Sequence, residues 1–170
     1  LPALAAELVR LKVDVIVTAA PAAPEAAQRA TSTIPIVFAV VGDPVAVGLV
    51  ASVARPGGNI TGLSSMASEV VGKELELLKE VAPKISRMAV LQNPGNPGHP
   101  NQSRLAEGAA QVLGVQLQIL DARTSSEIDA AFAAMRKQRA GGVLVLRDAM
   151  FRTQRTQIVA LAAKSRLPAV

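Results

Sequence analysis

Cysteine, tryptophan and tyrosine are absent from the 170 residues, and the chain holds three phenylalanines and a single histidine. Without cysteine, the protein has no disulfide, no thiolate metal site and no thiol nucleophile. One histidine without a nearby set of thiolates also disfavours a transition-metal site. The sequence therefore predicts no catalytic residue, no metal ligand and no cofactor.

Long apolar runs are missing as well. No stretch approaches the ~18 to 20 apolar residues that a helix needs to cross a bilayer. The N-terminus, Leu1-Pro2-Ala3-Leu4, lacks a basic segment followed by an apolar stretch and a cleavage site, so these residues contain no recognisable signal peptide.

Acidic residues are the minority charge, with 13 Asp and Glu against 18 Lys and Arg. Such an excess of positive charge invites a nucleic-acid interpretation. The cations, however, are scattered singly along the chain, and Phe38, Phe132 and Phe151 are not interleaved with them as stacking platforms would be. The pattern predicts a solvated basic surface and no nucleic-acid partner.

Half of the residues are apolar, and they gather in short runs rich in Val, Ile and Leu. Continuous runs of this kind are typical of parallel strands covered on both faces by helices. The runs are Val13 to Val17, Ile34 to Val41, Met88 to Leu91 and Gly142 to Leu146. Helical spacing lies between them, as at Val71, Leu75 and Leu78. The sequence predicts an α/β fold built from right-handed βαβ units.

Several segment boundaries are marked by capping residues. Gly114 follows a helical pattern as a helix-stopping glycine, and Thr124 to Glu127 fits a capping box. Val115 to Ile119 alternates apolar with polar residues, which predicts an edge strand with one face in water.

A weak internal repeat predicts two lobes. The first half of the chain has the predicted order helix, strand, helix, and then Ile34-Pro35-Ile36. The second half repeats this order and ends at Leu167-Pro168-Ala169. In both halves a proline stands at the entrance of a strand. We expect a partial N-terminal lobe at 1–63, a partial C-terminal lobe at 64–170 and a hinge near 55–65. Because the chain opens on a helix and stops where the echoed strand begins, we expect both Rossmann-like lobes to be truncated.

Several segments together resemble a known family. They are Ile34 to Val45, Gly48 to Gly62 with its Arg55-Pro56-Gly57-Gly58-Asn59, Gly72 to Glu80, Ala89 to Pro94, and near the end Leu161 to Ala163 and Leu167 to Ala169. The chain resembles the TrpX-like ABC transporter substrate-binding proteins, which have the periplasmic-binding-protein type I fold. The resemblance implies a longer receptor, periplasmic or lipid-anchored, that binds a small solute between two lobes and delivers it to an ABC permease. Members with an assigned ligand are associated with aromatic amino acids.

Candidate ligand-binding residues follow the strands, because ligands of doubly wound sheets bind at the carboxyl ends of the strands. After the first strand come Thr18, Ala19 and Ala20. The family usually has a hydroxyl residue where Ala20 stands, so one donor is missing. Asp43 follows the second strand; it is suited to accept a ligand ammonium and equally suited to cap a helix from Val45 to Ala54.

The remaining candidates are Ser64, Ser65, Asn93 and Asp148. The two serines and Asp148 are alternatively caps. Arg147 is alternatively a carboxylate clamp or half of a surface ion pair, and Phe151 an apolar wall or a core residue. We interpret His99, which has no catalytic companions in the sequence, as an exposed loop histidine.

Two classes of function remain open. A non-enzymatic receptor for a small solute, such as an amino acid, fits the polar loops. The alternative is the ligand-sensing core of a cytosolic regulator, or an α/β enzyme. For an enzyme, the chain lacks a Ser-His-Asp set, a metal cluster and a phosphate-binding glycine loop.

Overall fold

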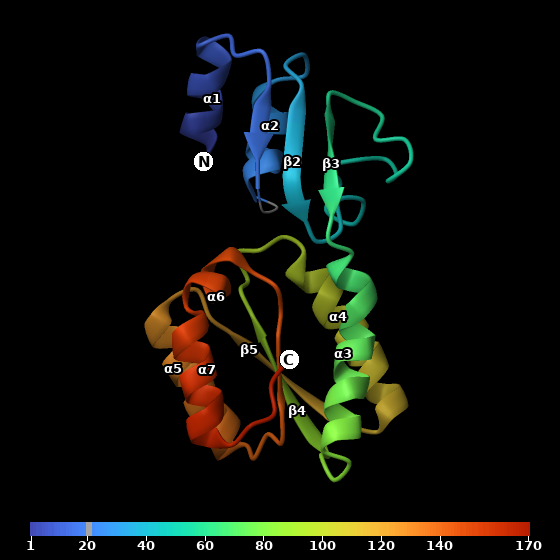
Figure 1. Ribbon diagram of the computed structural model, residues 1–170, viewed down its shortest axis with the longest axis vertical. Coiled ribbons are helices and arrows are strands. Elements are labelled where there is room, and N and C mark those ends of the chain that lie inside the picture. The colour runs from blue at the N-terminus through green and yellow to red at the C-terminus, as the bar shows by residue number, and fades with distance from the viewer. Residues whose placement is uncertain (20–21) are drawn as a thin grey trace. The chain divides into compact units, whose positions relative to one another are not determined.

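The computed structural model describes residues 1–19 and 22–170 (Figure 1). The chain divides into two compact units, which we call the N-terminal unit (Leu1–Ala67 with Asn96–Gly98) and the C-terminal unit (Ser68–Gly95 with His99–Val170). Each unit contains one three-stranded parallel sheet. Helices connect the strands of the C-terminal unit, whereas in the N-terminal unit a helix connects β1 to β2 and a loop connects β2 to β3. The predicted α/β fold with parallel sheets is confirmed. The lobe boundary at 63/64 and the hinge near 55–65 stay predictions.

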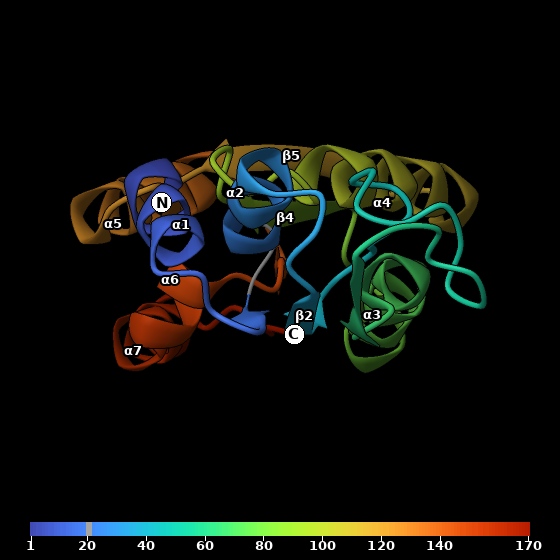
Figure 2. The same cartoon turned by 90° about the horizontal axis from the view of Figure 1, so that it is seen from above.

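The sheet of the N-terminal unit has the order β1-β2-β3. Ile16 pairs with Ile36, and Ile36 pairs with Ile60, so the strands start in register. The elements of the unit are α1 (Pro2–Arg10), β1 (Ile16–Thr18), α2 (Ala22–Ala30), β2 (Ile36–Val41) and β3 (Ile60–Ser64). Figure 2 shows α1 and α2 on the same side of the strands.

One face of this sheet forms the core of the N-terminal unit. Ile16, Ile36 and Phe38 are at most 2% exposed and pack with Ala27 of α2 and with Leu49 of the loop after β2. The side chains that alternate with them face the other way and are open within the described chain: Val17 is 70% exposed, Leu63 69%, Val40 53% and Val37 37%. The expectation of strands buried on both faces is wrong for this sheet.

A helix predicted from Val45 to Ala54 is also absent. Residues 44–48 form turns, in which the amides of Leu49 and Val50 both donate to the carbonyl of Pro44. Gly48 lies at φ +74°, a left-handed conformation that interrupts a right-handed helix. The apolar residues of this segment still reach the core, as Leu49 and Val50 show.

The sheet of the C-terminal unit has the order β5-β4-β6, with every pairing parallel. Its strands are β4 (Arg87–Gln92), β5 (Gln116–Asp121) and β6 (Val143–Val145). Its helices are α3 (Ala67–Val81), α4 (His99–Leu113), α5 (Ser125–Lys137), α6 (Ala149–Thr153) and α7 (Arg155–Ser165). Strand β5 lies at an edge, as predicted, but its Gln118 is only 9% exposed, so the expected wet face is wrong at that residue.

Helices cover both faces of this second sheet (Figure 1). Met88 and Val90 of β4 pack with α3 and α4, whereas Ala89 and Leu91 pack with α5 and α7. All four side chains are fully buried. The continuous apolar run of β4 therefore has the burial that its sequence predicts.

The internal repeat corresponds to equivalent strand pairing. The amide of Ile16 donates to the carbonyl of Pro35 at 2.9 Å, and the amide of Val143 donates to the carbonyl of Pro168 at 2.9 Å. In both places the proline carbonyl serves the neighbouring strand, and its missing amide costs no ladder bond.

Two predicted caps are confirmed. Gly114 stops α4 at φ +64°, and the hydroxyl of Thr124 accepts a hydrogen bond from the amide of Glu127 at the start of α5. Among the described residues, no helix is long and apolar enough to cross a membrane.

Candidate functional site

Each unit presents its candidate residues at the carboxyl edge of its own sheet. Thr18 and Ser64 end β1 and β3, and Asp43 follows β2. In the other unit, Asn93 directly follows β4, and Asp148 follows β6. In a parallel sheet these positions share one edge, which is where doubly wound folds bind ligands.

Thr18 has an unused hydroxyl. Its side-chain oxygen is buried and makes no hydrogen bond within the described residues. An unpaired buried hydroxyl costs about 1 to 3 kcal/mol, so this group gains from any partner that reaches it. Ala19 is exposed, and Ala20 lies outside the described residues.

The carboxylate of Asp43 is half-buried. One of its oxygens accepts a hydrogen bond from the amide of Ala46 at 2.9 Å, so Asp43 caps the turn that replaces the predicted helix. The structure shows no further hydrogen bond to this carboxylate among the described residues. Its second oxygen is thus available to an ammonium or amide donor.

The two serines after β3 differ. Ser64 donates its hydroxyl to the carbonyl of Gly42 at 3.3 Å and accepts from the amide of Met66 at 3.1 Å. It therefore ties the end of β3 to the end of β2. Ser65 is exposed, and its side chain makes no hydrogen bond among the described residues. Of the two hydroxyls, that of Ser65 is free for a ligand.

In the C-terminal unit, Asn93 and Asp148 contact each other. The amide nitrogen of the Asn93 side chain donates to Asp148 Oδ1 at 3.2 Å, and the same oxygen accepts from the amide of Met150 at 2.8 Å. Asn93 Oδ1 accepts from the amide of Gly95 at 2.9 Å. Asp148 therefore caps α6, and the pair joins the loop after β4 to the loop after β6.

His99 is fully buried beside this pair, so its interpretation as an exposed loop histidine is wrong. Its Nδ1 accepts from the amide of Asn93 at 2.8 Å, and its Nε2 lies 3.3 Å from the carbonyl of Arg147. These partners fit one neutral tautomer, protonated on Nε2. Burial lowers the pKa of His99 and outweighs the opposite influence of the Arg147 carbonyl and the Asp148 charge.

Phe151 completes the cluster. Its ring stacks on the imidazole of His99 with centroids 6.4 Å apart, and it is 3% exposed, so it is a core residue. The guanidinium of Arg147 donates to Glu74 of α3 in an ion pair. Arg147 therefore forms a surface ion pair, which is one of the two roles that the sequence allowed for it.

The sequence did not predict the hydrogen bonds that hold the end of β4 and the loop after it. Gln92 accepts from Ser103 at 2.5 Å and donates to Asp121 at 2.8 Å, which links β4 to α4 and β5. The local signal for the buried histidine is the doubled Asn-Pro-Gly from Asn93 to Gly98. Its two side-chain turns lead directly into α4 at His99.

Among the described residues, no group of three or more His, Asp or Glu side chains is placed to hold a metal ion. The polar groups at the two edges are carboxylates, hydroxyls and loop amides, which are the types of group that orient polar solutes in binding sites.

Comparisons with known proteins agree with this architecture. A crystal structure of an ABC domain in complex with L-Trp from Streptococcus pneumoniae superposes with a TM-score of 0.87 over 99% of this chain and 56% of that one, at 22% identity. A conserved domain protein from Vibrio cholerae superposes with a TM-score of 0.86 over 99% of this chain and 57% of that one, at 31% identity.

Sequence comparison points the same way. A tyrosine-binding protein of Clostridioides difficile (strain R20291) is 33% identical over 132 residues, which are 78% of this chain and 38% of that protein. The chain thus spans well under two thirds of these relatives. The family described as ABC transporter substrate binding protein matches residues 1–170. The chain therefore belongs to the family of ABC transporter substrate binding proteins, as its resemblance to the TrpX-like members predicts.

Proposed function

We propose that the protein is the solute-binding receptor of an ABC importer, either periplasmic or lipid-anchored on the outside of the membrane. It binds a small solute and delivers it to the membrane permease. The observation that carries this proposal is the placement of polar side chains at the carboxyl edge of each parallel sheet, in a chain of this family. At the edge of the N-terminal unit, the hydroxyl of Thr18 makes no hydrogen bond among the described residues.

The solute class that best fits these edges is an α-amino acid. Asp43 and Asp148 are half-buried carboxylates suited to an ammonium, while the hydroxyls of Thr18 and Ser65 and the loop residue Ala19 offer hydrogen bonds to a carboxylate. The relatives named above include one crystallised with L-Trp and one named for tyrosine binding. The backbone amide of Asn93 and both polar atoms of its side chain make hydrogen bonds, and one of these bonds holds Asp148 in place.

Receptor function without catalysis is supported by the chemistry of the site. The one histidine is buried and uses both ring nitrogens in contacts with the backbone, so it is not available as a general base. Ser64 is engaged as a tie between strands, with no base beside it among the described contacts.

Calorimetric titration of the full-length protein tests the proposal. The panel consists of L-Trp, L-Tyr, L-Leu, ribose and benzoate, and thermal unfolding is followed in parallel. We expect one of the amino acids to bind, and saturation at ~100 times its Kd to stabilise the fold by about 2.7 kcal/mol. Binding of ribose or benzoate alone contradicts the amino-acid class. Chemical conversion of a bound solute, detected by mass spectrometry, contradicts the receptor.

A further inference from the structure

Positive charge is unevenly divided between the two units. The N-terminal unit has four Lys and Arg residues and four Asp and Glu residues, so it is neutral overall. The C-terminal unit has fourteen basic and nine acidic residues, and it carries the whole net charge of +5. The excess charge is therefore a property of one unit rather than of the whole chain.

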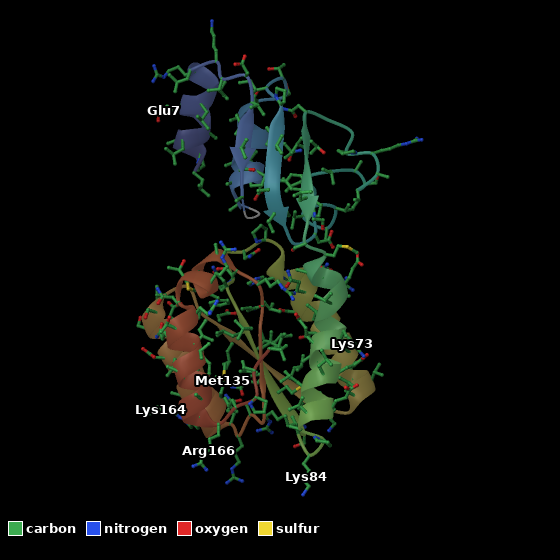
Figure 3. All side chains as sticks on the ribbon, in the orientation of Figure 1. Glu7, Lys73, Lys84, Met135, Lys164 and Arg166 are labelled. Atoms are coloured by element: carbon green, nitrogen blue, oxygen red, sulfur yellow. The ribbon has the colours of Figure 1, made fainter. Side chains whose placement is uncertain are left out.

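Within the C-terminal unit, the cations gather at the amino edge of the sheet, opposite to the candidate site. Three separate segments end there: the turn from α3 into β4, the turn from α5 into β6, and the end of α7. Figure 3 shows Lys84 and Arg166 extending outward at this end of the unit, with Lys164 nearby. The basic residues of these segments, which we call the basic end, are Lys79, Lys84, Arg87, Arg136, Lys137, Arg139, Lys164 and Arg166; the one acidic residue is Glu80.

Helix dipoles explain part of this arrangement. Arg136, Lys137 and Lys164 lie in the last turns of α5 and α7, where cations offset the negative helix end. Lys84, Arg139 and Arg166 lie beyond the helices, and the last two occupy left-handed positions at φ +57° and +52° that usually favour glycine or asparagine. None of these three forms an ion pair or a side-chain hydrogen bond among the described residues.

A hollow of about 530 Å³ opens among these residues. Its rim carries Lys84, Arg87 and Arg139, and its floor contains the buried Ile85. The guanidinium of Arg87 is fixed by bonds to the carbonyl of Gln138 and the side chain of Gln116, so one side of the rim is rigid. Apolar lining also comes from Ala82, Pro83 and Gly141, and none of the described residues that line the hollow is acidic.

We propose that the basic end docks the protein on an anionic phospholipid surface, with a phosphate headgroup in the hollow between Lys84, Arg87 and Arg139. A cationic rim over an apolar floor suits an amphiphilic anion better than a fully hydrated free phosphate. Cations from three segments at one end suit an extended charged surface. Nucleic acid fits poorly, because the three phenylalanines are at most 3% exposed and offer no stacking platform.

Flotation of the full-length protein with lipid vesicles tests the proposal. We expect binding to vesicles of phosphatidylcholine mixed with phosphatidylglycerol, no binding to phosphatidylcholine alone, and a steep loss of binding as sodium chloride is raised. The triple variant Lys84→Gln, Arg139→Asn, Arg166→Asn should bind about 100-fold more weakly, because each cation near an anionic membrane contributes roughly fivefold. Asparagine is chosen at Arg139 and Arg166 because it tolerates the left-handed conformation.

The matched control removes the same three charges from elsewhere in the unit: Arg104→Gln, Arg123→Gln, Arg155→Gln. It should keep vesicle binding within about threefold, because these residues lie outside the basic end. The charge-retaining variant Lys84→Arg, Arg139→Lys, Arg166→Lys should also bind, and circular dichroism should show that all variants are folded. Equal losses in the two triple variants overturn the proposal, since net charge alone would then account for binding. So does displacement by inorganic phosphate that binds on its own, or tighter binding to duplex DNA than to the vesicles.

Discussion

The two sheets share a three-stranded parallel design but differ in how they are covered. In the C-terminal unit, Leu91 and Val90 of β4 face opposite sides, and both are fully buried under helices. In the N-terminal unit, Phe38 is buried under α2 and the loop after β2, while Val17 and Leu63 on the other face are open within the described chain. An apolar run therefore shows which face is able to be buried, and the covering elements decide whether it is.

The candidate residues of the two units differ in the same way. In the C-terminal unit, Asn93, His99 and Asp148 hold one another through hydrogen bonds that join two loops. In the N-terminal unit, Asp43 makes one hydrogen bond, and the hydroxyl of Thr18 makes none among the described residues. One edge is preorganised, and the other keeps unused hydrogen-bonding capacity for a solute.

Truncating one leucine in each sheet gives the largest expected contrast. Leu91→Ala removes a fully buried side chain from β4 and should lower the free energy of unfolding by about 2 to 5 kcal/mol, because it leaves a cavity. Leu63→Ala in β3 removes a side chain that is 69% exposed and should cost about 0.5 kcal/mol or less. Urea unfolding measures both.

A large decrease in the free energy of unfolding for Leu63→Ala would contradict this difference between the sheets, because it would mean that the open face of the N-terminal sheet is covered. Hydrogen exchange of β3 in the same samples distinguishes this from a local effect. Protection equal to that of β4 would accompany a covered face.

Two glycines give the next contrast. A Cβ at Gly62 in β3 would lie 2.1 Å from the carbonyl oxygen of Phe38, so Gly62→Ala forces the two strands apart and should destabilise the protein by about 1 to 3 kcal/mol or more. At Gly72, inside α3, the added Cβ would meet Ala109 at 3.6 Å, an ordinary contact. Gly72→Ala should stabilise by about 0.5 to 1 kcal/mol through helix propensity. Thermal unfolding should move in opposite directions, and a loss in both would contradict the packing of α3.

The single histidine makes the C-terminal unit sensitive to pH. Because burial lowers the pKa of His99 from its ordinary 6.5, the unfolded chain takes up a proton near that pH while the folded chain does not. Its contribution to stability is therefore complete above about pH 6.5 and is lost as the pH falls toward the lower folded pKa. Between pH 7.5 and 5.5 we expect the free energy of unfolding, measured with urea, to fall by at most about 1.4 kcal/mol, the limit for a group that protonates near pH 6.5 only in the unfolded chain.

His99→Gln is the control, since glutamine can donate and accept hydrogen bonds but does not titrate. The variant should lose the decline between pH 7.5 and 5.5 while keeping the changes at lower pH that come from carboxylates. An unchanged decline in His99→Gln would show that another group titrates. NMR of the imidazole should show the Nε2-protonated neutral tautomer at pH 7.

The sequence alone predicted the strands better than their surroundings. The four predicted apolar strands are present because continuous Val and Ile runs are a local signal, although β1 begins at Ile16 and not at Val13. Pro35 stands at the entrance of β2 as predicted, whereas the echoed strand after Pro168 forms only a single bridge between Val143 and Ala169. The helix expected from Val45 failed because Gly48 takes a left-handed conformation that apolar content does not reveal. His99 was misjudged because its partners come from the loops after β4 and β6, which only the tertiary fold brings together.

The last contrast removes one negative charge from each edge and keeps the cap. Asp43→Asn and Asp148→Asn both retain a side-chain oxygen for the amides of Ala46 and Met150, so each should change stability by only a few tenths of a kcal/mol. Any loss of solute affinity then reports the charge itself. Asp43 is expected to matter more, because its second oxygen has no other hydrogen bond among the described residues, whereas Asp148 also receives Asn93. We expect Asp43→Asn to weaken binding of an amino-acid solute about tenfold in calorimetry, the scale of one charge-assisted hydrogen bond. If Asp148→Asn has the larger effect, the preorganised edge of the C-terminal unit is the one that recognises the ammonium.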